Sequence, residues 1–131
     1  MGIRSISAGP LLLALTSAAF GDGLTITKTV RAGVTTELHA YTSWHGPTCK
    51  TDGGVVKPLS KPQHGTLIPQ KAMRMFPTSR YGSDECAGRA YPAFVILYRS
   101  APNFRGVDNF SVQVTFGGGR SEVDYYTVNV N

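Results

Sequence analysis

The chain has 131 residues, the size of one ordinary domain, and 16% of them are charged. Its formal net charge of +5 comes from 13 lysines and arginines that are spread along the sequence and form no basic run or stripe. This distribution is typical of a solvated surface, and it argues against a nucleic-acid-binding protein.

The first 19 residues have the three parts of an export signal. Arg4 supplies a positive charge, residues 11–15 form a short apolar run, and small side chains follow at Ser17, Ala18 and Ala19. The apolar run is too short to cross a bilayer, which needs about 20 apolar residues. We therefore expect residues 1–19 to be cleaved as a signal peptide, with no transmembrane segment left afterwards and a periplasmic or secreted product.

The mature chain is then predicted to be one domain over residues 20–131. Without Arg4, 12 basic side chains face 8 acidic ones, which leaves a charge of about +4. A modest positive field of this kind suits an anionic partner outside the cytoplasm, such as an acidic polysaccharide or a membrane face.

Two strands are expected near the start of the domain. Residues 24–30 and 34–44 read as a pair around the turn at Arg31-Ala32-Gly33. In the second strand, period-2 alternation places Leu38 on one face together with Ala40 and Thr42. The same alternation places His39 and Tyr41 on the other face.

Four short segments in the middle of the chain are also predicted to be strands: residues 55–56, 66–68, 72–76 and 94–98. Prolines separate them, and each is expected to interrupt a ladder or to set a turn. These prolines are Pro58, Pro62, Pro69, Pro77 and Pro92.

The strongest pattern is near the C-terminus. Residues 110–116 alternate apolar and polar side chains, which predicts a strand with Phe110, Val112, Val114 and Phe116 in the core. Three glycines follow, and residues 122–130 then form the second strand of a hairpin, with Tyr126, Val128 and Val130 on one face. Seven or eight short strands separated by turn signals indicate an all-β sandwich.

Cys49 and Cys86 are the only cysteines, and in an exported chain an even pair is most simply a disulfide. The alternative is a nucleophilic cysteine with a histidine partner, which both the compartment and the even number disfavour. The stretch from Ser79 to Arg89, rich in glycine, serine and charge, is then a loop tethered by this bond.

Two windows carry a family resemblance: Pro62-Gln63-His64-Gly65-Thr66-Leu67, and the segment from Tyr98 to Phe110. They resemble the repeat of bacterial immunoglobulin-like and cadherin-like modules, in which a His-Gly-Thr turn precedes a strand and a Phe-x-Gly-x-Asp-x-Phe segment leads into the next-to-last strand. The resemblance implies a Greek-key immunoglobulin-like sandwich of about seven strands. It also implies that the motif residues are structural and that no catalytic set is inherited.

The residue types in these windows suggest a structural role for each motif residue. Gly106 allows a tight turn, Asp108 can accept hydrogen bonds from turn amides, and Phe110 enters the core. Tyr98 is expected to pack its ring and to return its hydroxyl to the backbone, while His64 and Gly65 form the turn.

A metal site has weak support in the sequence. The candidate ligands are His39, His45, His64, Asp52, Asp84 and Glu85. No pair among them has the spacing of a known metal site, and a calcium loop at residues 51–54 would offer a single carboxylate. We therefore predict no metal and no cofactor.

An aromatic group is the other candidate for binding. Its members could stack on sugar rings, or they could cover the end and the edges of the sandwich for their area alone. They are Tyr41, Trp44, Tyr81, Tyr91 and Tyr125. As candidate ligand contacts we single out Trp44 and Tyr41 together with Arg99 and Arg105, which flank a loop at one end of the sandwich.

Enzyme activity is not expected. Asp84 and Glu85 are adjacent and would point apart in an extended chain, so they do not make a general acid and base pair. The sequence predicts an exported, noncatalytic immunoglobulin-like module with a binding, structural or adhesive role in a bacterial envelope. The partner would be a protein or a polysaccharide. The alternative is a domain that binds carbohydrate or an anionic polymer.

Overall fold

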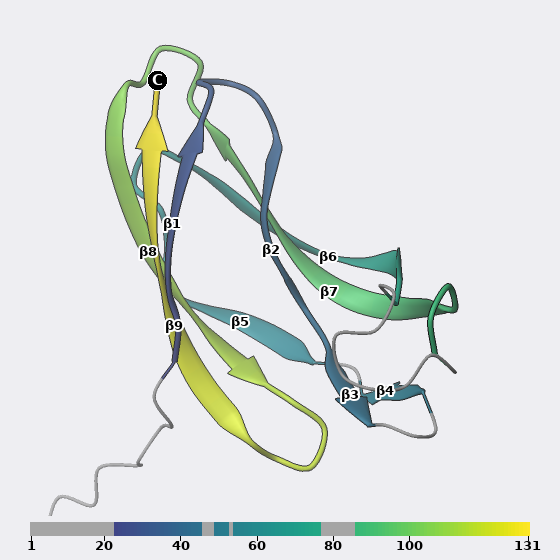
Figure 1. Ribbon diagram of the computed structural model, residues 1–131. Coiled ribbons are helices and arrows are strands. Elements are labelled where there is room, and N and C mark those ends of the chain that lie inside the picture. Colours follow the sequence, from purple (N-terminus) through teal and green to yellow (C-terminus); the bar gives the residue numbers. More distant parts are fainter. Residues whose placement is uncertain (1–22, 46–48, 53, 77–85) are drawn as a thin grey trace, which may run out of the picture.

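The computed structural model (Figure 1) describes residues 23–45, 49–52, 54–76 and 86–131, and every regular element within these ranges is a β-strand. The strands in chain order are β1 (Thr25–Val30), β2 (Thr36–Tyr41), β3 (Ser43–His45), β4 (Lys50–Asp52), β5 (Val55–Ser60), β6 (Gly65–Met75), β7 (Ala90–Ser100), β8 (Gly106–Thr115) and β9 (Ser121–Val130). Within the same ranges, no helix has the length and apolar character needed to span a membrane. The predicted signal peptide lies outside the described residues.

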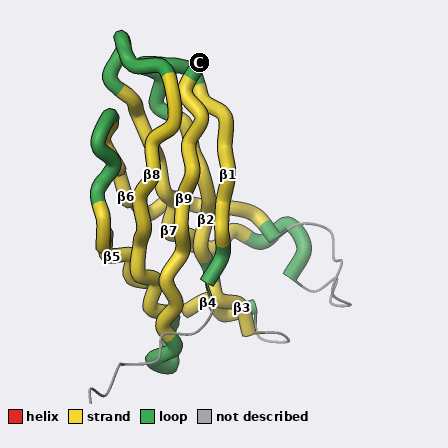
Figure 2. The backbone as a smooth tube through the Cα atoms, turned by 90° about the vertical axis from the view of Figure 1, so that its left-hand side faces the viewer, coloured by secondary structure: helices red, strands yellow, loops and turns green. Residues whose placement is uncertain are grey.

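The strands form two principal sheets that pack face to face. One sheet has the order β1-β9-β8-β5 and the other has the order β2-β7-β6, while β3 and β4 form a small separate ribbon. Figure 2 looks toward the four-stranded sheet, with the strands of the three-stranded sheet behind it. The predicted all-β sandwich is therefore confirmed.

The core lies between the two sheets and follows the alternation read from the sequence. From the four-stranded sheet, β8 buries Phe110, Val112 and Val114, and the chain then buries Phe116 just beyond β8. On β9 the buried residues are Tyr126, Val128 and Val130, as predicted. The three-stranded sheet supplies the opposite wall with Leu38, Ile96 and Tyr98.

The first two strands do not form the predicted hairpin. β1 pairs in parallel with β9, from Thr25 beside Tyr125 to Val30 beside Val130, whereas β2 pairs with β7 in the other sheet. The turn between them contains Gly33 at a φ of +72°, and it carries the chain from one sheet to the other. β1 buries its apolar side on the same core from the four-stranded sheet, so a local pairing with β2 is not needed.

The predicted faces of β2 are wrong at Tyr41. The register between β2 and β7 shifts between Glu37 and His39, so that Leu38 is an extra residue without a partner on β7. This bulge moves the alternation by one position. As a result Leu38 and Tyr41 both lie in the core, where only 3% of the Tyr41 surface remains exposed.

Three prolines predicted to break strands lie inside them. Pro58 is in β5 and Pro69 in β6, and both strands are at the edge of their sheets, where a missing N–H can face away from the ladder. Pro92 lies in the part of β7 that has β6 on one side only, because the pairing with β2 ends at Phe94. At each position an open side of the strand accommodates the ring.

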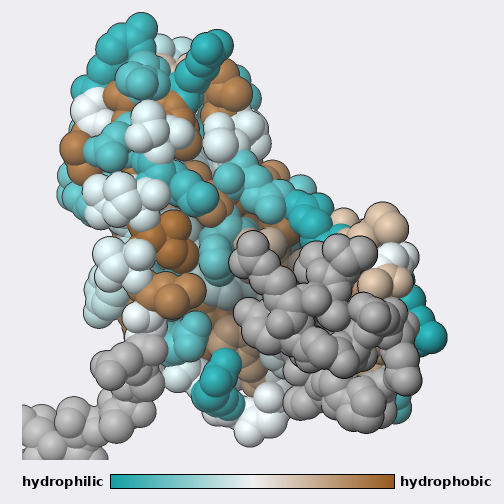
Figure 3. Space-filling view, in the orientation of Figure 1, coloured by the Kyte–Doolittle hydropathy of each residue, from teal (hydrophilic) through white to brown (hydrophobic). Residues whose placement is uncertain are grey.

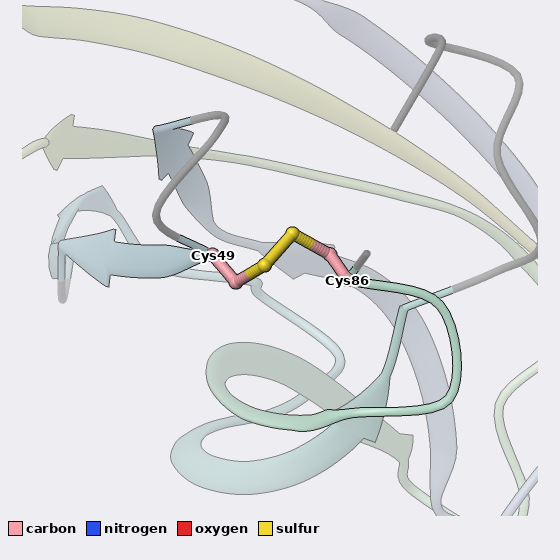
Figure 4. Close-up of a disulfide and its surroundings, with 2 residues drawn as sticks. All are labelled: Cys49 and Cys86. Carbon is pink, nitrogen blue, oxygen red and sulfur yellow. A yellow bond between two sulfur atoms is a disulfide. The ribbon is translucent and has the colours of Figure 1, made fainter. Parts of the chain in front are cut away.

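The predicted disulfide joins Cys49, directly before β4, to Cys86 in the segment that leads to β7 (Figure 4), and the two Cα atoms are 5.5 Å apart. Most of the predicted loop from Ser79 to Arg89 lies outside the described residues. Its last part turns back, since Arg89 accepts a backbone hydrogen bond from Phe76. A structural disulfide of this kind indicates an oxidising compartment outside the cytoplasm.

Replacing Phe110 by alanine should lower the free energy of unfolding by about 3 to 5 kcal/mol, because the ring is buried in the middle of a central strand. Gln113→Ala, on the outward face of the same strand, should change it by less than about 0.5 kcal/mol. Urea unfolding measures both values. Equal midpoints for the two variants would contradict the assignment of faces.

The disulfide should be intact in the purified mature protein, so an alkylating reagent should label no thiol until a reductant is added. Since 37 positions separate the two cysteines, reduction should lower the free energy of unfolding by about 3 to 4 kcal/mol. Mass spectrometry with and without reductant tests the first point. Denaturant unfolding tests the second, and two labelled thiols in the unreduced protein would refute the bond.

Candidate functional site

The two sequence windows meet at one buried carboxylate. Asp108 on β8 is 2% exposed, and its Oδ1 accepts a hydrogen bond of 2.9 Å from the backbone N–H of Gln63. Its Oδ2 accepts one of 3.0 Å from the N–H of His64 and one of 2.8 Å from the hydroxyl of Tyr98. The Asp108 side chain thus ties the turn before β6 to β8, the strand that begins within the second window.

This arrangement corrects the predicted hydrogen-bond partner of Tyr98 and explains why two positions are glycine. The hydroxyl of Tyr98 bonds to Asp108 and not to the backbone, because a buried carboxylate needs donors more than a peptide carbonyl does. Gly65 lies against the same tyrosine, and a Cβ there would come within 2.7 Å of the Tyr98 ring. Gly106 has a φ of +141°, which a glycine adopts without strain.

A second buried carboxylate was not anticipated. Asp124 on β9 is fully buried, and it accepts a 2.7 Å hydrogen bond from the N–H of Leu24 and a 2.5 Å bond from the hydroxyl of Tyr41. The Tyr41 and Tyr126 hydroxyls are 2.6 Å apart. A signal was present in the sequence, since Asp124 shares the inward face of its strand with Tyr126 and Val128.

The predicted contacts Arg99 and Arg105 lie at the end of the sandwich where β7 ends and β8 begins. Both are exposed, and the Nε–H of Arg99 donates to the carbonyl of Gly33 at 3.1 Å. Arg105 lines an open pocket of about 340 Å³ together with Arg31 and Pro102. In Figure 3, hydrophilic side chains gather at this upper end of the molecule. We call it the basic end, defined by Arg31, Arg99 and Arg105.

Hydrogen bonds between three connections fix the basic end. The hydroxyl of Ser100 accepts a 3.0 Å bond from the N–H of Gly33, which joins β7 to the β1–β2 turn. The N–H of Ala101 donates to the carbonyl of His64 at 2.9 Å, which joins the β7–β8 loop to the β5–β6 turn. The His64 ring also stacks on Phe104, with centroids 4.0 Å apart. Arg31 and Arg105 therefore project from connected loops, and Arg99 projects from the end of β7.

Exposed acidic side chains do not neutralise the basic end within the described ranges. Glu37 forms an ion pair with Arg74 instead, and Glu122 is at the start of β9, at the opposite end of that strand from Val130. Asp108 is close in sequence to Arg105, but its oxygens are buried and occupied. Among the described side chains, no carboxylate therefore pairs with Arg31, Arg99 or Arg105.

Among the described side chains, the structure does not bring together the candidate aromatic platform. Tyr41 is buried in the core, so it cannot contact a ligand, and this expectation was wrong because of the bulge in β2. Tyr91 and Tyr125 belong to different sheets. Trp44 lies in β3 opposite Thr51, but its side chain is outside the described part of the chain, as is Tyr81.

The metal-ligand candidates are also separated. His39 is on β2, where burial lowers its pKa and its ring packs edge-on to Tyr41 at 4.6 Å. His64 is on the β5–β6 turn, and the side chains of His45, Asp52, Asp84 and Glu85 are not among those described. Among the described side chains, no group of three or more His, Cys, Asp and Glu residues is placed to hold a metal ion.

Comparisons with protein-family models, curated proteins and solved structures find no match for this chain.

The buried tyrosines should make the protein sensitive to alkaline pH. Burial, reinforced by hydrogen bonds to Asp124 and Asp108, raises the pKa of Tyr41 and of Tyr98, and burial also raises the pKa of Tyr126. Below pH about 10 these hydroxyls are neutral in both states and their full contribution to stability is present. Above it, the unfolded chain releases protons that the folded chain retains, so the free energy of unfolding falls.

The decline should reach up to about 1.4 kcal/mol per pH unit for each of the three residues. Urea midpoints measured on either side of pH about 10 test this, and Tyr98→Phe should make the decline shallower. A free energy of unfolding that stays constant as the pH rises would contradict the burial of these hydroxyls.

Proposed function

We propose that this protein is a noncatalytic immunoglobulin-like module that acts outside the cytoplasm, in the periplasm or after secretion from a bacterial cell. The strand order supports the immunoglobulin-like part of this proposal. If β1, β2, β5, β6, β7, β8 and β9 are lettered A to G, the sheets read BED and AGFC. Immunoglobulin-like sandwiches divide their strands between BED and GFC sheets, and here strand A joins the G edge.

The proposal rests on the observation that the buried polar groups are engaged in hydrogen bonds within the scaffold. Asp108 and Asp124 are the buried carboxylates of the described chain, and each is occupied by hydrogen bonds that connect strands and turns. A catalytic carboxylate must instead be reached by a substrate. Because the motif residues stabilise the scaffold, we place the function on the protein surface, as in binding and adhesive modules.

A second candidate function is the binding of an acidic polysaccharide or another anionic polymer at the basic end. Arg31 and Arg105 line the same open pocket, and Arg99 lies beside it through its bond to Gly33. Guanidinium groups present paired N–H donors that match carboxylates and sulfates. Loops at the end of a sandwich are also where ligand contacts usually concentrate.

Retention on an immobilised acidic polysaccharide such as heparin tests this second function. The protein should be retained at low ionic strength and released as salt rises, because exposed charges are screened over about 8 to 10 Å at physiological ionic strength. The double variant Arg99→Gln and Arg105→Gln should elute at clearly lower salt than the parent.

The matched control is Lys28→Gln with Lys57→Gln, which removes the same charge from two exposed strand positions. It should elute close to the parent. If both double variants elute at the same salt concentration, retention depends on net charge and not on the basic end. If the protein is not retained even at low salt, this second function is wrong and only the structural or adhesive role is left.

A further inference from the structure

The outer face of the four-stranded sheet is unusual in carrying no charge on three neighbouring strands. β1 presents Thr25, Thr27 and Thr29, and in the parallel register these lie beside Tyr125, Thr127 and Asn129 of β9. The outward positions of β8 are likewise uncharged, from Val107 to Thr115. A soluble surface is well served by charge at about 25 to 35% of its residues, whereas the outward positions of these three strands carry none.

The charged residues of the same strands take the other parity. Lys28 is in register with Val128, and Asp108 and Asp124 point into the core. The face is therefore neutral because of how its strands alternate, even though the domain as a whole is basic.

Tyr125 stands in the middle of this neutral face. It lies on β9, between β1 and β8, and 57% of its surface is exposed, whereas its neighbour Tyr126 is buried. Beside it is a shallow pocket of about 190 Å³, whose polar lining comes from Ser60, Asn109, Ser111 and Thr127. An aromatic ring thus adjoins a hollow that hydroxyl and amide groups line together with atoms of Phe110 and Tyr126.

These polar groups keep hydrogen-bonding capacity for a ligand. The Thr127 hydroxyl donates to Oδ1 of Asn109 at 3.1 Å, which leaves the two amide N–H donors of that asparagine. The hydroxyls of Ser60 and Ser111 are 2.8 Å apart, so one of them donates to the other and the second proton is free to point elsewhere. The pocket therefore offers both donors and acceptors without a formal charge.

We propose that this face is a binding site for a neutral saccharide, one of whose rings packs its C–H face on Tyr125 and places its hydroxyls against Asn109, Ser60 and Thr127. An aromatic platform beside a few placed polar groups is suited to a ligand with an apolar face and a hydroxyl rim. An anionic ligand would find no cation on β1, β8 or β9 here, and the cation that β5 adds to this sheet face is Lys57, in register with Gln113 and outside the pocket lining. This site is separate from the basic end and does not depend on it.

A second copy of the chain fits the face less well. The large apolar side chains exposed on β1, β8 and β9 are Tyr125 and Val107, and β5 adds Val55 at the edge. The positions around Tyr125 are mostly threonine, serine, asparagine and glutamine. The buried core of a stable homodimer interface is more apolar than this. Hydroxyl and amide groups are better matched by the hydroxyls of a sugar.

Native gel electrophoresis in the presence of soluble neutral polysaccharides, namely a mixed-linkage β-glucan, a galactomannan and dextran, tests the proposal. At least one should retard the parent protein. Tyr125→Ala should weaken the apparent affinity about tenfold or more, equivalent to about 1.4 kcal/mol, while Tyr125→Phe keeps most of it because the ring remains. Retardation should be the same at low and high salt, since no charge is involved.

The double variant Arg99→Gln and Arg105→Gln serves as the control and should be retarded like the parent. Thermal unfolding midpoints should match among all variants, because the altered side chains are exposed. No retardation by any of the three polysaccharides, or equal retardation of Tyr125→Ala and the parent, would overturn the proposal. A dimer in light scattering that Tyr125→Ala dissociates would assign the face to self-association instead. None of these outcomes affects the heparin test of the basic end.

Discussion

The rest of the structure depends on two buried carboxylates that tyrosines reach from across the core. Asp108 and Asp124 belong to the four-stranded sheet, whereas Tyr98 and Tyr41, which donate to them, belong to the three-stranded sheet. A hydrogen bond to a charged group contributes about 1.5 to 3 kcal/mol, and a buried carboxylate left without donors costs several kcal/mol. Apolar side chains alone would tolerate some sliding of one sheet over the other. These directional bonds permit one relative placement of the sheets.

Each of these pairs also positions a surface that we propose for binding. Asp108 holds the β5–β6 turn through the N–H groups of Gln63 and His64, and the carbonyl of His64 in turn holds the β7–β8 loop at the basic end. Asp124 binds the N–H of Leu24, directly before β1, and so fixes the register that brings Thr25 beside Tyr125. Both surfaces are thereby ordered before a ligand arrives, which lowers the entropy that binding must overcome.

Much of the scaffold could be predicted from the sequence because its signals are local or obligatory. Alternation predicted the faces of Phe110 and Val128 correctly, and two cysteines leave one intramolecular pairing. The parallel pairing of β1 with β9 could not be predicted, since partners 100 positions apart leave no trace in either strand. The bulge at Leu38 was also hidden, and one extra residue sufficed to move Tyr41 from the surface to the core. Asp124 was missed because an acidic residue near the start of a strand resembles a solvent-facing one, although its position in the alternation places it with Tyr126 and Val128.

Of the two proposed surfaces, the basic end could be predicted from the sequence and the neutral face could not, for a physical reason. Arg99 and Arg105 flank a loop that turn residues mark, so their place at the end of the sandwich follows from chain order. The neutral face exists only once β1, β9 and β8 are side by side, because its members come from segments far apart in the chain. On a sheet, outward side chains repeat about every 6.6 to 6.8 Å along a strand and about every 4.8 Å between strands. Such a grid of hydroxyl and amide groups is set by backbone geometry and not by loop conformation. It can therefore present a constant spacing to a ligand that itself repeats, which favours a polysaccharide over a single free sugar as the occupant of this face.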